Sequence, residues 1–80
     1  MDRIRVFEVC KQYIHDEYHK NVLESIIDRI QSSKQVPLTT WFSCLGLLGE
    51  IQAQRFIPLD VRVDIDETHE WIIQQIKSSN

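Results

Sequence analysis

Apolar and polar residues alternate along residues 57–66. The apolar positions are Ile57, Leu59, Val61, Val63 and Ile65, and the positions between them hold Pro58, Asp60, Arg62, Asp64 and Asp66. A period of two with β-branched residues is typical of a half-buried strand. We therefore expect a β-strand near residues 57–65, with Val61 and Val63 facing the core and Arg62 and Asp64 facing solvent or a partner.

The predicted strand has no obvious partner in the chain. A lone strand leaves its backbone N–H and C=O groups unpaired, which is unfavourable where they are buried. One internal alternative is residues 3–6, which also alternate and would bring Arg3 and Arg5 near Asp60 and Asp64. Otherwise a second copy of the chain, or another protein with an open sheet edge, completes the pairing.

Two helices are predicted before residue 33. Apolar residues at helical spacing indicate a first helix from about Asp2 to Tyr18, with Asp2 as its N-cap. Asn21 and Glu24 have the spacing of a cap and its return partner, so the second helix is expected to start at Val22. The alternative is one long helix with a kink near His19.

Two more helices flank the predicted strand. The third should be capped by Thr39 or Thr40 and run to about Phe56, with an apolar surface nearly all round its start. Gly46 and Gly49 lie inside it and suggest the close approach of another backbone. The fourth should be capped by Asp66 and turn three side chains inward: Trp71, Ile72 and Ile76.

The predicted fold is therefore mostly α, of the α+β class. We expect about four short helices and one β-strand in a compact single domain covering residues 1–80, with an all-α bundle as the alternative. The 80 residues are 42% hydrophobic and 26% charged, which is typical of a globular protein and excludes disorder. The first residues do not resemble a signal peptide, and the nearly apolar stretch 41–49 is too short to span a bilayer. We expect a soluble cytoplasmic protein.

The net charge of −3 is unevenly distributed. Residues 60–70 carry one basic residue, Arg62, against five acidic ones: Asp60, Asp64, Asp66, Glu67 and Glu70. Such a tract is a poor match for a nucleic-acid backbone and a better match for a basic patch on a protein. The alternative is a solvated edge that discourages aggregation.

Few residues suggest a chemistry. Cys10 and Cys44 lie in apolar helical stretches, so we expect buried free thiols. His15 and His19 have the helical spacing of a zinc-binding pair. Asp16 stands where the zincin motif needs Glu, and a third ligand would have to be distant. We expect solvent-exposed residues at a helix end, and neither a metal nor a cofactor.

These features predict a non-catalytic protein-interaction or assembly module, such as an adaptor, inhibitor or regulator. It would act through the apolar third helix and the unpaired strand, with these contact residues: Trp41, Leu59, Asp60, Val61, Arg62, Val63 and Asp64. The expected partner is a second copy, in a homodimer, or another protein with a basic patch or an open sheet edge. The alternatives are a small metal-dependent enzyme or metal-binding protein using His15 and His19, and a helical nucleic-acid-binding domain.

Overall fold

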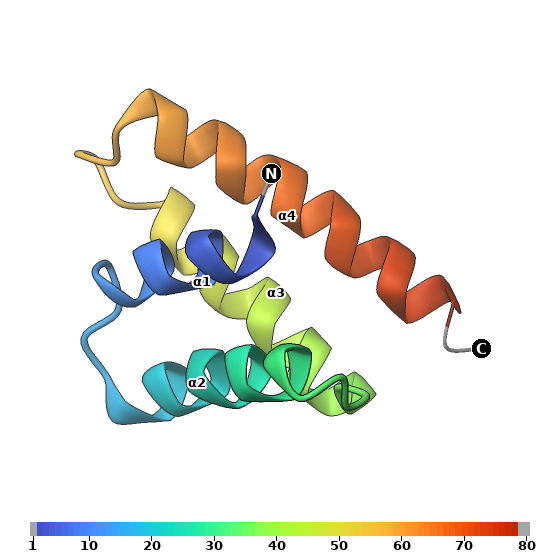
Figure 1. Cartoon of the computed structure of the whole chain (residues 1–80). Coiled ribbons are helices and arrows are strands. Elements are labelled where there is room, and N and C mark those ends of the chain that lie inside the picture. Colours follow the sequence, from blue (N-terminus) through green and yellow to red (C-terminus); the bar gives the residue numbers. More distant parts are fainter. Residues whose placement is uncertain (1, 79–80) are drawn as a thin grey trace.

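The computed structural model describes residues 2–78, which fold into four α-helices without any strand (Figure 1). The helices are α1 (Arg3–Lys11), α2 (Glu17–Gln31), α3 (Leu38–Gln52) and α4 (Leu59–Ser78). The all-α alternative is therefore confirmed, and the α+β class with a strand near residues 57–65 is wrong.

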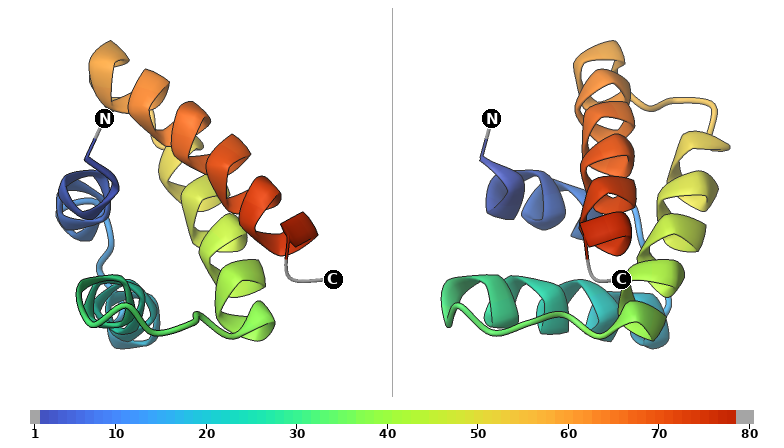
Figure 2. Two further views of the ribbon diagram at one scale, coloured as in Figure 1. Left: turned by 45° about the vertical axis from the view of Figure 1, so that its right-hand side comes forward. Right: turned by 90° about the vertical axis from the view of Figure 1, so that its right-hand side faces the viewer.

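The helices form two antiparallel pairs. Helices α3 and α4 form a long hairpin, and the axes of α1 and α2 run across it (Figure 2). Each helix packs against the next along the chain, and α1 also packs against α4, so the four helices close into a ring. The core fills the middle of this ring with these buried side chains: Val6, Phe7, Cys10, Ile14, Leu23, Ile26, Ile27, Val36, Trp41, Cys44, Leu47, Leu48, Ile51, Ile57, Ile65 and Ile72.

The segment predicted as a strand is the first part of α4. Val61, Ile65 and Ile72 recur at helical spacing and contribute to the core from one face of this helix. The main-chain carbonyl of Pro58 accepts a hydrogen bond from the N–H of Arg62 at 3.0 Å, so helical pairing begins directly at the proline. A helix pairs its backbone groups internally, whereas a lone strand would leave them unpaired.

The first predicted helix is divided in two. Asp2 caps α1 as predicted, with Oδ1 accepting from the N–H of Ile4 at 3.0 Å and of Arg5 at 3.4 Å. The helix nevertheless ends at Lys11 rather than near Tyr18.

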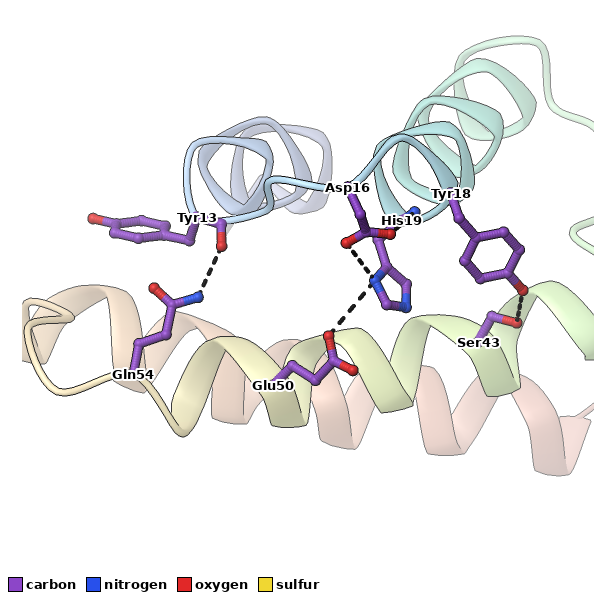
Figure 3. Close-up of polar contacts among 7 residues, drawn as sticks. All are labelled: Tyr13, Asp16, Tyr18, His19, Ser43, Glu50 and Gln54. Carbon is purple, nitrogen blue, oxygen red and sulfur yellow. Dashed lines mark hydrogen bonds and ion pairs between the residues drawn. The ribbon is translucent and has the colours of Figure 1, made fainter.

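Two hydrogen bonds fix the turn between α1 and α2. Gln54, after the end of α3, donates from Nε2 to the carbonyl oxygen of Tyr13 at 2.8 Å (Figure 3). Asp16 then caps α2 by accepting a hydrogen bond from the N–H of His19 at 3.0 Å. The predicted cap at Asn21 is therefore wrong, because α2 begins at Glu17, five residues before the predicted start at Val22.

Helix α2 ends in a Schellman motif. The N–H of Lys34 donates to the carbonyl of Arg29 at 2.7 Å, and the N–H of Ser33 donates to the carbonyl of Ile30 at 3.2 Å. Ser33 has a φ of 56°, so a serine occupies the left-handed position that glycine usually fills.

The start of α3 also differs from the prediction. Its N-cap is Pro37, whose carbonyl accepts from the N–H groups of Thr40 and Trp41 at 3.0 and 3.1 Å. Thr39 and Thr40 lie inside the helix rather than capping it. Gly46 and Gly49 are exposed on α3, and a Cβ built on either would meet nothing within 4 Å. The prediction that they allow close backbone approach is therefore wrong.

Two tryptophans connect three of the helices. The rings of Trp41 and Trp71 meet edge to face, with centroids 5.6 Å apart and an interplanar angle of 88°. The guanidinium of Arg3, at the start of α1, lies 5.4 Å from the centroid of Trp71. The predicted inward orientation of α4 is confirmed, because Ile72 is buried and Trp71 and Ile76 pack against the core.

Candidate functional site

Three large apolar side chains are exposed at the turn between α3 and α4. Phe56 in the turn is 92% exposed, Leu59 at the start of α4 is 77% exposed, and Val63 one turn later is 46% exposed. We call these three residues the apolar end. A soluble protein exposes single apolar side chains routinely, whereas a group of large ones marks a contact surface.

The local sequence places Phe56 in solvent. The third helix was predicted to run to about Phe56, but α3 ends at Gln52, so Phe56 lies in the turn that follows it. Ile57 is buried and anchors the turn to the core, while Pro58 begins the next helix. Pro58 indicates that a helix ends before it, but it does not show that α3 ends as early as Gln52.

Arg62 holds the α3–α4 turn. Its Nη1 donates to the carbonyl of Gln52 at 2.7 Å, and its Nη2 donates to the carbonyl of Gln54. These carbonyls lie at the C-terminal end of α3, where unpaired acceptors carry partial negative charge. Hydrogen bonds from Arg62 therefore fix the turn that carries the apolar end.

Acidic side chains continue the outer face of α4 beyond the apolar end. Asp66, Glu67 and Glu70 are exposed and follow Leu59 and Val63 at helical spacing on the same face. We call these three residues the acidic stripe. Asp66 accepts a hydrogen bond from Nε2 of Gln52. Within residues 2–78, the side chains of Glu67 and Glu70 form no ion pair.

The predicted contact residues do not share one surface. Leu59, Asp60 and Val63 are exposed, whereas Trp41 is only 5% exposed and belongs to the core. The other three, Val61, Arg62 and Asp64, are half-buried. The assignment of Val63 to the buried face and of Arg62 to the open face is wrong, because it depended on the period of a strand. The predicted set of contact residues did not include Phe56, which is the most exposed residue of the apolar end.

The two predicted metal-binding histidines are not on one helix. His15 precedes α2 and is exposed, while His19 lies in the first turn of α2. Nδ1 of His19 lies 2.9 Å from Oδ1 of Asp16 and 3.6 Å from Oε2 of Glu50 in α3 (Figure 3). The same ring nitrogen faces both carboxylates, so His19 places a polar contact between the start of α2 and Glu50 of α3. Between residues 2 and 78, no three His, Cys, Asp or Glu side chains form a group that could hold a metal ion.

Both cysteines are free and buried, as predicted. Desolvation by burial raises the pKa of the Cys10 thiol to about 12. It also raises the pKa of Cys44 to about 12, with the neighbouring Cys10 adding to the effect. A thiol reacts as its thiolate, so both side chains behave as small apolar groups at neutral pH.

Among the open hollows between helices, two have linings that concern the polar contacts described above. One, of about 300 Å³, separates α2 from α3 and has an uncharged lining: Tyr18, Asn21, Val22, Ser25, Thr39, Thr40 and Ser43. The hydroxyls of Tyr18 and Ser43 form a hydrogen bond at 3.1 Å at its side (Figure 3). The other, of about 290 Å³ between α1 and α4, is lined by Arg5, Asp60 and Asp64 among others. The strand pairing that was to bring Arg3 and Arg5 near these carboxylates is wrong, because both segments are helical and Arg3 lies against Trp71.

Comparisons with protein-family models, with curated proteins and with solved structures found no match to this chain. Of the helices formed by residues 2–78, none has both the length and the apolar character that crossing a membrane requires.

Proposed function

We propose that this chain is a non-catalytic protein-interaction domain, such as an adaptor, inhibitor or regulator, that binds its partner through the apolar end. The observation that carries the proposal is the near-complete exposure of Phe56 beside the exposed Leu59. Burying apolar surface stabilises a complex by about 25 cal/mol per Å², and aromatic side chains are enriched among the residues that dominate binding energy.

The apolar end is not needed to complete the core. The core already draws buried side chains from all four helices, and Phe56, Leu59 and Val63 lie outside it. Its support is rigid, because Ile57 and Arg62 fix the turn from both sides. A rigid surface loses little conformational entropy on binding, which favours affinity.

The partner is either a second copy of the chain or another protein. The double variant Phe56→Ser, Leu59→Ser should keep the far-ultraviolet circular dichroism of the wild type and lose the association. Light scattering over a micromolar concentration range measures association between copies. Quantitative affinity capture from cells that make the protein measures association with another protein.

Phe42→Ser is the matched control. Phe42 is a second exposed phenylalanine, 57% exposed, and it lies near the start of α3, whereas the apolar end follows the other end of that helix. Association should survive in this variant. The proposal fails if the double variant associates as the wild type does, or if Phe42→Ser reduces the association equally.

A further inference from the structure

We infer that the partner on this surface is a basic amphipathic helix, whose apolar residues cover the apolar end and whose Lys or Arg residues face the acidic stripe. This inference rests on the proposed function and specifies the chemistry of the partner.

Leu59 and Val63 of the apolar end share one face of α4 with the acidic stripe, and Phe56 lies in the turn that precedes this face. Leu59, Val63, Glu67 and Glu70 are separated by four, four and three residues, so they lie along one face of α4. At 1.5 Å per residue, the distance from Leu59 to Glu70 along the axis is about 16 Å. A helical segment of about three turns covers such a strip.

The fold concentrates negative charge on this strip. The basic residue within this part of α4 is Arg62, and both of its terminal nitrogens donate to carbonyls at the end of α3. Arg62 is therefore directed toward α3 instead of neutralising the acidic stripe. Along the chain, the next basic residues are Arg55, which precedes Phe56, and Lys77 near the end of α4. The basic side chains of α1 that lie near α4 are Arg3, against Trp71, and Arg5, beside the hollow that Asp60 and Asp64 line.

Charge complementarity favours a basic partner over a second copy. Two copies that packed through the outer face of α4 would bring their acidic stripes together if the helices were parallel. If the helices were antiparallel, each acidic stripe would lie against the apolar end of the other copy without a compensating cation. Like charges facing each other oppose association, whereas opposite charges accelerate it and fix its register. A basic amphipathic helix can bury its apolar residues against the apolar end and place its Lys or Arg residues beside the acidic stripe. Amphipathic helices bind many protein surfaces through an apolar face in this way.

Three synthetic peptides test the inference against the complete chain. The basic probe is a helix-forming peptide of about 15 residues, long enough for marginal helicity, with leucines on one face flanked by lysines. The acidic probe replaces each lysine with glutamate. The scrambled probe has the composition of the basic probe without a helical apolar face. Fluorescence anisotropy of the labelled peptides measures each dissociation constant at low and high ionic strength.

The wild type should bind the basic probe at least about tenfold more tightly than the other two, and more weakly at high ionic strength. The double variant Glu67→Lys, Glu70→Lys should lose about tenfold in affinity for the basic probe. Glu17→Lys, Asp28→Lys is the matched control, with the same charge change on α2, where Glu17 and Asp28 are exposed. It should change affinity much less.

The outcomes separate this inference from the proposed function. Binding that needs Phe56 and Leu59 but is equal for the basic and acidic probes overturns the inference and leaves the proposed function standing. Equal binding of the scrambled probe, or an equal loss in the α2 control, also overturns the inference, since it indicates general attraction between opposite charges. A stable dimer that depends on Leu59 and survives Glu67→Lys shows that a second copy occupies the surface, and overturns the inference as well.

Discussion

The guanidinium of Arg62 in α4 donates a hydrogen bond to the main-chain carbonyl of Gln52, the last residue of α3, across 2.7 Å. A second bond reaches the carbonyl of Gln54 in the turn. One side chain thus binds the end of one helix from the beginning of the next. The alternating pattern around Arg62 suggested an outward-facing residue on a strand, and the structure gives it the opposite role.

Replacing Arg62 should therefore destabilise the domain. Arg62→Glu removes two hydrogen bonds from a charged donor and places a carboxylate against carbonyl oxygens. The expected loss is about 1.5–3 kcal/mol in the free energy of unfolding, measured by urea denaturation. Arg55→Glu makes the same charge change at an exposed position and should alter stability little. If the two variants unfold at the same urea concentration, the role assigned to Arg62 is wrong.

The two faces of α4 can be distinguished by one substitution at two nearby positions. Ile65 is fully buried, so Ile65→Asp would bury a charge and should unfold the domain. Val63 is 46% exposed, and Val63→Asp should change the free energy of unfolding by no more than about 1 kcal/mol. Circular dichroism and urea denaturation measure both effects. Equal damage from both substitutions is the result that a strand in this segment, and not a helix, would produce.

Features set by neighbouring residues could be predicted from the sequence. The cap at Asp2 depends on one side chain and the next turn, and burial of Cys10 and Cys44 follows from their apolar surroundings. The start of α4 could not be decided locally, because Val61 and Ile65 satisfy both a period of two and a spacing of four. The choice depends on the longer run, since Ile72 and Ile76 continue the helical spacing from Val61 and Ile65.

The candidate surface was only partly predictable. The exposed positions of Leu59, Asp60 and Val63 were in the predicted contact set, but for a reason that the structure does not support. Exposure of Phe56 depends on where α3 ends, and helix ends are the least certain feature of a sequence pattern. Burial of Trp41 depends on Trp71, thirty residues away, which no local pattern specifies.

Gly46 and Gly49 should be replaceable by alanine with a gain in stability. Both are exposed in the interior of α3, and neither has an atom near enough to clash with a new Cβ. Alanine removes the entropic penalty of glycine in a helix, so each substitution should add about 0.5–1 kcal/mol to the free energy of unfolding. Urea denaturation measures the gain. A loss of stability from either alanine would mean that the glycine makes a close contact after all.

Replacing Ser33 with glycine should increase the stability of the domain. Its φ of 56° is unfavourable for a residue with a Cβ and unstrained for glycine. Ser33→Gly should therefore stabilise the domain by up to about 1 kcal/mol in thermal or urea denaturation. Ser32→Gly is the control, because Ser32 has a φ of −92° and gains nothing from glycine. Equal effects of the two substitutions would argue against the Schellman geometry.

The cap at Asp16 should make stability depend on pH in the acid range. The N–H of His19 lowers the pKa of Asp16 below its ordinary value of 3.8. A lowered carboxyl pKa stabilises the folded state above the unfolded pKa, and this stabilisation is lost as the pH falls through the folded pKa. Asp16→Asn keeps an acceptor oxygen but cannot ionise. The stability of the wild type should exceed that of this variant at neutral pH, and the difference should shrink below pH 3.8. A difference that is independent of pH would contradict the assignment.

The ring of helices has a kinetic consequence. Within residues 2–78, the main helix contacts join consecutive helices, and the contact between α1 and α4 joins helices from opposite ends of the sequence. Domains dominated by local contacts fold in microseconds to milliseconds, because little loop entropy is lost before each contact forms. The slowest step in folding is therefore the packing of α1 against α4, because it brings Arg3 into contact with Trp71 from the opposite end of the sequence. Packing of α1 against α4 completes the domain, whereas the α3–α4 hairpin that carries the apolar end forms from helices that are consecutive in the chain.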